Sequence, residues 1–383
     1  MKLHYYGMAA AASLMMLSAC THENWEAESA GSEAPVFIPG DSEFEILLSS
    51  GNGTTVSVNK RSAVNAINQM TEGIGVFCLA RGKQSINQAA PDITWFSDDA
   101  LSTCTLMKNV KASVADEEGN LSWDGHYFYP ISQFYAYGLY GYYPYVEDEN
   151  VTYANNQATV HYAIDGTQDL IWGRASAHDA DASAYSATFF RQSASDLEYV
   201  PVLKMKHLLT RLEFYVQPGE TYTGSGVVFD GAENMVVDSI QVLNAACNVN
   251  VLVADLANPN MENAVVTEGA GRADFRLRDA DGKLFDAVPV GTSLGQETKI
   301  GESIMLAPAS TYILRIYLKD TSTNMSYPTE YPLTLTSTDT GAMFQTGMSY
   351  KVTILANKPK EITLKANVEE WPQAENNPPS IIL

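Results

Sequence analysis

The sequence predicts an all-β protein built mostly of antiparallel sheets, as sandwiches or partly open barrels, and three observations support this fold class. Apolar residues alternate with polar ones in short runs, as at Phe44, Ile46 and Leu48. Turn signals separate such runs at short spacing, for example GNG at 51–53 and DEEGN at 116–120. Long apolar patterns with the period of a helix are scarce, so only a few short helices are expected.

The length of the chain predicts two domains. The chain has 383 residues, and a single core rarely grows far beyond about 250. We place the N-terminal domain at residues 36–198 and the C-terminal domain at residues 199–383. The clearest hairpin of the N-terminal domain is predicted at residues 110–125, where two alternating runs flank a Gly-Asn turn.

The C-terminal domain begins with a segment whose alternation changes phase. Leu203 and Met205 lie in one phase, whereas Leu212 and Phe214 lie in the other. A continuous strand cannot place both sets on one face, so a bulge or break is expected near residues 208–210.

Residues 1–19 have the pattern of a bacterial export signal. A Lys near the amine precedes an apolar run from Met8 to Leu17, which is too short to span a bilayer as a helix. The run ends in LSAC at 17–20, which resembles the lipobox of bacterial lipoproteins. Cys20 is therefore the predicted site of lipidation, with palmitate among the acyl chains, and several chains anchor stably where one is marginal. The alternative is an ordinary signal peptide that has a Cys there by chance.

Charge and composition limit the partners of the remaining chain. With 23 basic and 45 acidic residues the formal net charge is −22, which opposes binding to nucleic acid or to anionic lipid. Residues 20–35 are acidic, small and without a regular pattern, as expected of a tether. No later stretch approaches the roughly 18 consecutive apolar residues of a membrane-spanning helix, so membrane contact is expected only through the N-terminal lipid.

Three cysteines follow Cys20 in the chain, at Cys78, Cys104 and Cys247. An odd number cannot form a closed disulfide framework, and no pair has the CxxC spacing. We expect them to be small buried hydrophobes, with a single Cys78–Cys104 bridge in an oxidising compartment as the alternative.

Residues 126–145 are unusually rich in tyrosine. Aromatic residues favour pleated sheets, and a tyrosine can bury its ring while its hydroxyl stays in water. Core and sheet surface is the favoured interpretation. The alternative is a sugar-stacking platform, which would make the chain a surface glycan-binding lipoprotein.

No catalytic site, metal site or cofactor is predicted, so the chain is not expected to be an enzyme. GTSLG at 291–295 matches the nucleophile elbow around Ser293, but no helical pattern follows it and no His occurs after His207. HDAD at 178–181 supplies too few ligands for zinc or calcium. His207 itself is expected to be a hydrogen-bonded strand residue.

Several segments resemble the fimbrillins, which are lipoprotein-derived pilins and accessory fimbrial subunits of Gram-negative anaerobes. They cover most of the chain from Cys20 to Trp371, and their order and spacing carry the resemblance. Besides the lipobox, they are NKRSA at 59–63, GIGVFCLA at 73–80, YFYPISQFYAYGLYGYYPY at 127–145, DLIWGRAS at 169–176, LKMKHLLTRLEFYV at 203–216 and FQTGMSYKVTILANKPKEITLKANVEEW at 344–371.

The resemblance implies two transthyretin-like β-sandwich domains in tandem and a lipoprotein precursor at the cell outer membrane. It also implies that an arginine-specific protease removes the first strand, so that a strand of another subunit fills the groove left behind. In this chain the cut would fall between Arg61 and Ser62, and Arg81 is a second candidate. The alternative is that Lys60 and Arg61 form an ordinary solvated turn.

The strand lost on cleavage would contain some of the apolar residues Phe44, Ile46, Leu48, Val56 and Val58. The donor strand would be the C-terminal one, because Ile362, Leu364, Ala366 and Val368 alternate strictly with polar residues and mark one apolar face.

The function expected is that of a structural subunit of an adhesive surface fimbria, with other fimbrial subunits as partners through strand complementation. A host or bacterial surface ligand is a further expected partner. The alternatives are a non-polymerising anchor or tip subunit and the glycan-binding lipoprotein.

Overall fold

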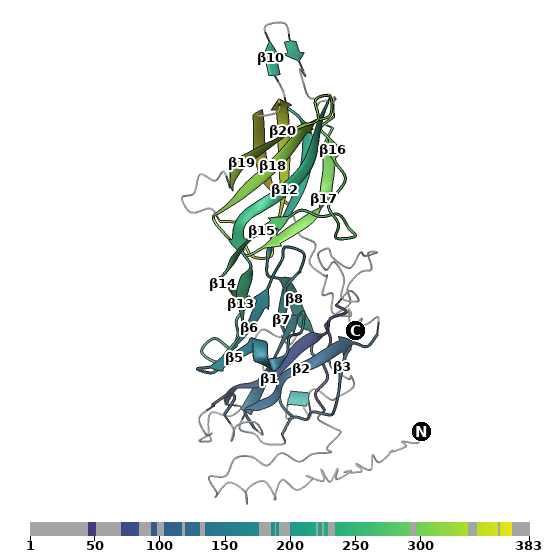
Figure 1. Ribbon diagram of the computed structural model, residues 1–383. Helices are drawn as coiled ribbons and strands as arrows, with labels where there is room; N and C mark the ends of the chain where they lie inside the picture. Colours follow the sequence, from purple (N-terminus) through teal and green to yellow (C-terminus); the bar gives the residue numbers. More distant parts are fainter. Residues whose placement is uncertain are drawn as a thin grey trace, which may run out of the picture.

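The computed structural model confirms the all-β fold class, with mostly antiparallel sheets stacked as two sandwiches end to end in an elongated molecule (Figure 1). The structure describes residues 45–50, 70–83, 93–97, 103–116, 119–130, 135–175, 185–187, 189–190, 200–219, 221–223, 226–228, 234–291, 296–335, 343–358 and 361–369. We call the two parts the lower and upper sandwich, as they stand in Figure 1.

The lower sandwich has a six-stranded sheet in the order β3-β2-β1-β4-β7-β8. Its strands are β1 (Ile74–Lys83), β2 (Thr105–Val114), β3 (Leu121–Trp123), β4 (Tyr135–Tyr143), β7 (Ile171–Ala175) and β8 (Leu203–His207). β2 and β3 form an antiparallel pair, which confirms the predicted hairpin at 110–125.

The second sheet of the lower sandwich has the order β14-β13-β6-β5. Its strands are β5 (Val151–Ala154), β6 (Gln157–Ala163), β13 (Asn248–Asp255) and β14 (Val265–Glu268), and the 3-10 turn η4 (Asp148–Asn150) precedes β5. Trp172 of β7 joins the two sheets, because its indole N–H donates to the carbonyl of Val253 in β13 at 2.9 Å.

The upper sandwich pairs a sheet β15-β12-β18-β19, to which β16 is attached through β12, with a sheet β17-β9-β20-β21. The strands are β9 (Thr210–Pro218), β12 (Met235–Ala246), β15 (Arg272–Arg276), β16 (Val288–Pro289), β17 (Thr298–Leu306), β18 (Thr311–Asp320), β19 (Met325–Thr334), β20 (Ser349–Lys358) and β21 (Glu361–Glu369). Between the sheets Phe344 packs against Tyr312 of β18 and Tyr350 of β20, at ring separations of 4.8 and 4.9 Å. A small hairpin of β10 (Thr221–Thr223) and β11 (Gly226–Val228) projects at the far end (Figure 1).

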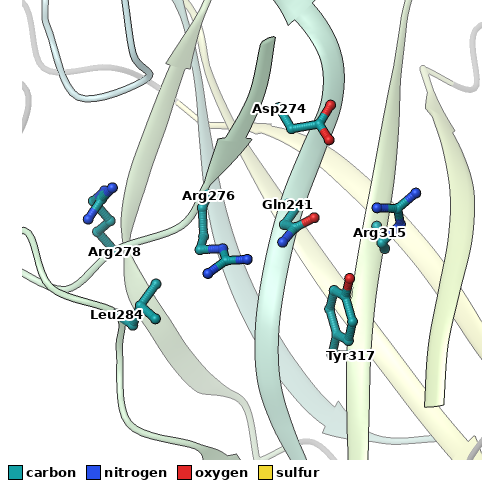
Figure 2. Close-up of a pocket in the computed structure, with 7 residues that line it drawn as sticks. All are labelled: Gln241, Asp274, Arg276, Arg278, Leu284, Arg315 and Tyr317. Carbon is teal, nitrogen blue, oxygen red and sulfur yellow. The ribbon is translucent and has the colours of Figure 1, made fainter. Parts of the chain in front are cut away.

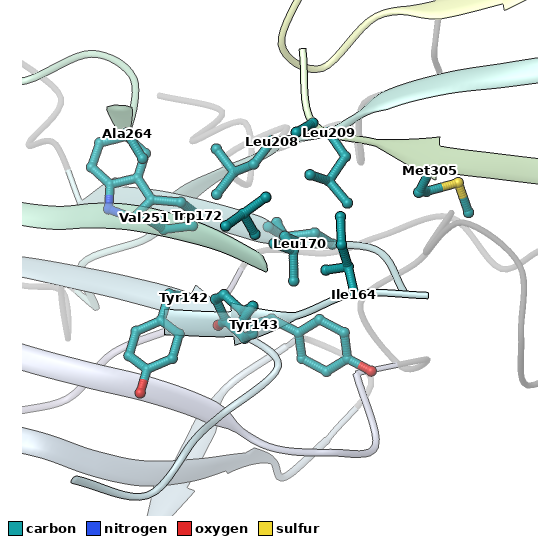
Figure 3. Packing of buried hydrophobic residues seen from close by; sticks show 14 of the residues in the cluster. Tyr142, Tyr143, Ile164, Leu170, Trp172, Leu208, Leu209, Val251, Ala264 and Met305 are labelled. Atoms are coloured by element: carbon teal, nitrogen blue, oxygen red, sulfur yellow. The ribbon is translucent and has the colours of Figure 1, made fainter. Parts of the chain in front are cut away.

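The chain passes between the sandwiches where its alternation changes phase. β8 ends at His207 in the lower sandwich and β9 begins at Thr210 in the upper one, which confirms the predicted break. The intervening Leu208 and Leu209 are buried and pack at the junction together with Leu170 and Met305 (Figure 3).

The chain then returns to the lower sandwich. Only Cys247 separates β12 of the upper sandwich from β13 of the lower one, and β14 is followed by β15 of the upper sandwich. Residues 248–268 thus belong to the lower sandwich although they follow residue 198. The division at 198 and 199 stays a prediction, and three strands that follow it, β8, β13 and β14, pair with strands that precede it or with each other.

The described part of the tyrosine-rich stretch is mostly core. Every residue of β4 (Tyr135–Tyr143) is buried, and Tyr129 before it is 2% exposed. Phe77 of β1 stacks on Tyr142 of β4 at 6.1 Å. The rings of β4 therefore face the interior and cannot form a sugar-stacking platform, whereas Tyr127, Phe128 and Tyr145 are half-buried.

The three later cysteines are free thiols. Cys78 and Cys104 are buried and Cys247 is half-buried, so the Cys78–Cys104 bridge is not formed. The strand register explains this, because Cys78 lies opposite Met107, whereas the carbonyl of Cys104 accepts from Ala80 further along β1. Burial also raises the pKa of the Cys78 thiol, which keeps it protonated and unreactive.

Candidate functional site

Residues 45–50, which we call the first segment, lie at the surface of the lower sandwich with an apolar edge turned inward. Ile46 is 0% and Leu48 is 1% exposed, whereas Leu47 between them is 46% exposed. This alternation is that of a strand with one buried face. The first segment therefore fills a position in the core of the lower sandwich.

Backbone hydrogen bonds tie the first segment to the chain around β3 on one side. These bonds run from Ile46 N–H to the carbonyl of Tyr127 at 2.7 Å, from Ser50 N–H to Gly119 at 2.8 Å, and from Leu121 N–H to Leu48 at 2.9 Å. The hydroxyls of Ser49 and Ser50 also donate to the Gly119 carbonyl, at 3.1 and 3.0 Å.

On its other side the first segment is tied to the start of β8. Ser49 donates its N–H to the carbonyl of Pro201 at 2.9 Å and accepts from the N–H of Leu203 at 2.8 Å. β3 and β8 are the two edge strands of the six-stranded sheet. The first segment thus satisfies backbone groups next to both edges, and its removal would leave those groups and an apolar trench open to water.

Ile46 and Leu48 were expected in the removable strand, and they are the two buried apolar side chains of the first segment. The roles of Ser49, Ser50 and Gly119 could not be predicted from the sequence, because a small polar residue after an apolar run is an ordinary strand end. Cys20, Phe44, Val56, Val58, Arg61 and Ser62 lie outside the described residues.

Arg81, the second cleavage candidate, lies within β1, which pairs with β2 on one side and β4 on the other. Its guanidinium donates to the side-chain oxygen of Asn260, and burial lowers its pKa from the usual value. A protease needs an extended, accessible chain, so a cut here would require the central strands of the sheet to separate.

The expected donor strand is β21, at the edge of the sheet β17-β9-β20-β21. Ile362, Leu364 and Ala366 are half-buried and pack against the core, whereas Thr363 is exposed. They lie opposite the fully buried face of β20, since Leu364 pairs with Ile354 and Ala366 with Val352; Val368 lies in the same strand opposite Tyr350, but its side chain is outside the described residues.

The structure does not bring the first segment and β21 together within one chain. The first segment lies in the lower sandwich and β21 pairs with β20 in the upper one (Figure 1). Only β20 pairs with β21 among the described strands, so one edge of β21 carries backbone groups without a strand partner.

The described residues offer no constellation typical of catalysis. His207 is buried and its Nδ1 lies 2.9 Å from Asp169 Oδ2, as expected of a hydrogen-bonded core histidine. Within the described ranges no three His, Cys, Asp or Glu side chains gather as a metal site would require. Ser293 and residues 178–181 lie outside those ranges.

Within the described ranges, no helix is both long and apolar enough to cross a bilayer.

A family model described as "Fimbrillin-like" matches residues 61–371. No curated protein matches the chain in sequence. Solved structures that resemble it include candidate cell adhesion proteins from Bacteroides uniformis and Bacteroides eggerthii, with 17% and 13% identity and TM-scores of 0.45 and 0.37. They cover 87% and 89% of this chain and 100% and 98% of their own. The fimbrial anchor protein Mfa2 from Porphyromonas gingivalis matches with 9% identity and a TM-score of 0.31, over 85% of this chain and 98% of its own.

Proposed function

The chain belongs to the fimbrillin-like family, and we propose that it is a structural subunit of a surface fimbria that assembles by strand exchange. Membership of that family gives the chain a fimbrial and adhesive role at the cell surface and makes other fimbrial subunits its partners. The proposal adds the way in which the subunit is exported, activated and joined to the next one.

The observation that carries the proposal is the environment of the first segment. It fills the core through Ile46 and Leu48 and is bonded through its backbone on both sides, yet the family match begins only at residue 61. Burial of two such side chains is worth about 3 to 6 kcal/mol before ordering costs. Loss of the segment after cleavage between Arg61 and Ser62 would therefore leave a groove in which binding of a replacement strand is strongly favourable.

β21 is suited to be that replacement strand. Its apolar side chains repeat every second residue, as Ile46 and Leu48 do, so a donated β21 can place Ile362 and Leu364 in the two positions vacated. Its half-buried face and open edge make it less costly to withdraw than a central strand.

Export as a lipoprotein precursor would bring the uncleaved subunit to the outer membrane. Lipidation of Cys20 would hold the uncleaved chain there, with residues 20–35 as a tether. Cleavage at Arg61 would then separate the body of the subunit from its anchor and free it for assembly in the same step.

The experiment is treatment of the purified chain with an arginine-specific protease, followed by fragment masses and oligomer size. The expected result is a new N-terminus at Ser62 and a ladder of oligomers, both absent in Arg61→Ala. Arg81→Gln is the matched control, since Arg81 lies inside β1 and its loss should leave cleavage unchanged.

Two outcomes would contradict strand exchange. Protection of Arg61 in the folded chain, or cleavage without any ladder, would favour the alternative of a non-polymerising anchor or tip subunit with the same fold.

A further inference from the structure

We propose that a groove on the outer face of the sheet β15-β12-β18-β19 binds an acidic carbohydrate through its sulfate or carboxylate groups. The groove is open to solvent and has a volume of about 670 Å³, within the range of ligand sites in proteins. Figure 2 shows Arg278, Arg276, Gln241 and Arg315 in a row across the sheet, with Tyr317 and Leu284 on one side of the row and Asp274 on the other.

The groove concentrates positive charge in an acidic protein. The chain has nine arginines and a net charge of −22, and three of those arginines line this groove. Arg315 is paired with Glu330, through Nε at 2.9 Å and Nη2 at 2.5 Å. Within the described ranges no carboxylate oxygen lies within 4.0 Å of the guanidinium groups of Arg276 and Arg278.

Neutral groups hold these two guanidinium groups in place. Gln241 is 7% exposed, and with its amide oxygen toward Arg276 it accepts from Nε at 3.2 Å and from Nη2 at 2.7 Å. Arg278 Nη1 donates to the carbonyl of Gly282 at 2.9 Å. A guanidinium has five N–H donors, so both keep unused donors while their full charge is retained. An oriented arginine fork matches a carboxylate or sulfate, and pre-orientation lowers the cost of binding.

The walls favour a sugar over an extended peptide. Tyr317 offers an aromatic ring with a hydroxyl, and Leu284 is 56% exposed, so the groove supplies apolar contact for a ring beside its polar groups. A peptide cannot add to the sheet here, because β12 and β18 are paired on both sides. Nucleic acid and anionic membrane would extend beyond the groove and meet the net charge of −22, whereas a short acidic sugar contacts only the arginine-lined groove.

The groove is separate from the strands that the proposed assembly uses. It lies on the outer face of one sheet of the upper sandwich, whereas β21 belongs to the other sheet and the first segment to the lower sandwich. Binding can therefore be measured on the uncleaved monomer, and its outcome is independent of strand exchange.

The test is titration of the monomer with sialyllactose and a heparin tetrasaccharide as the acidic probes. Lactose serves as the neutral probe and hexaglutamate as the acidic peptide. We expect saturable binding of at least one acidic sugar and none of lactose or hexaglutamate. The double variant Arg276→Gln/Arg278→Gln should weaken this binding at least about tenfold.

Arg272→Gln is the matched control for charge. Arg272 lies in β15 with Arg276 but outside this groove, and it is paired with Glu268 at 2.5 Å. Its loss should therefore change the affinity for the acidic sugar less than about twofold. Unchanged thermal midpoints would show that all variants fold. Absence of binding to both acidic sugars, equal binding of lactose, binding of hexaglutamate alone, or an equal loss in Arg272→Gln would each overturn the proposal.

Discussion

Leu203 donates its backbone N–H to the carbonyl of Ser49 at 2.8 Å, which ties the first segment to the start of β8. The two residues are far apart in the chain, and one precedes the expected cleavage site whereas the other follows it. A cut at Arg61 would therefore turn an intramolecular contact into one between two separate pieces. Only non-covalent bonds would then hold the first segment in place.

The first prediction concerns the weight of the first segment in folding. Leu48→Ala should lower the free energy of unfolding of the uncleaved chain by about 2 to 5 kcal/mol, because it empties a buried site. Leu47→Ala, at the exposed neighbouring position, should change it by less than about 0.5 kcal/mol. Urea unfolding measures both, and equal effects would show that the segment is not a core strand.

The second prediction concerns the donor face of β21. After cleavage, Leu364→Asp should abolish the oligomer ladder, because a carboxylate cannot enter an apolar trench without a large desolvation cost. Thr363→Asp, on the exposed face of the same strand, should assemble like the unchanged chain. Size-exclusion chromatography of the cleaved variants decides between them, and a normal ladder from Leu364→Asp would exclude β21 as donor.

The third prediction concerns Gly347, which lies just before β20 and close to His207 at the end of β8. Gly347 has φ of +70°, and a Cβ placed there would lie 2.6 Å from the carbonyl oxygen of His207. Gly347→Ala should therefore lower the free energy of unfolding by about 2 kcal/mol or more, because it adds left-handed backbone strain and a clash with a carbonyl.

Gly82→Ala is the control for that change. Among the described residues, no atom outside its chain neighbours lies within 4 Å of a Cβ placed at Gly82, so its effect on the free energy of unfolding should stay well below that of Gly347→Ala. Similar losses at the two positions would contradict the close approach at His207.

The alternation of apolar residues and the turn residues correctly predicted features that depend on neighbouring residues. The hairpin of β2 and β3 followed from alternation around a Gly-Asn turn, and the break between β8 and β9 followed from the change of phase between Met205 and Leu212. Both features depend only on residues close together in the chain.

Long-range pairing could not be predicted in this way. β13 pairs with β6 across the expected domain boundary, and the alternation within either strand does not identify the strand with which it pairs. The row of Arg276, Gln241 and Arg315 arises in the same way, since register between β15, β12 and β18 brings the three side chains together. The position of Cys104 relative to Cys78 likewise depends on the register of β1 and β2.

The fourth prediction concerns alkaline pH. Burial raises the pKa of Tyr140 to about 12, above the value near 10 of a free tyrosine. Unfolding therefore releases a proton above pH 10, so the stabilising contribution of this phenol is complete below about pH 10 and falls as pH rises to about 12.

Tyr140→Phe removes this titration together with the hydrogen bond to the carbonyl of Pro259. It should be less stable than the unchanged chain near neutral pH, and the difference should shrink by up to about 2 to 3 kcal/mol between pH 10 and 12. Urea unfolding at a series of pH values measures this. A difference that stays constant with pH would contradict a buried, neutral phenol.

The most direct test of strand exchange is the N-terminal residue of the subunit inside assembled fimbriae, read by mass spectrometry. Strand exchange after cleavage predicts Ser62, with residues 1–61 absent from the fibre. A fibre built from chains that still begin at a lipidated Cys20 and retain Ile46 and Leu48 would contradict it.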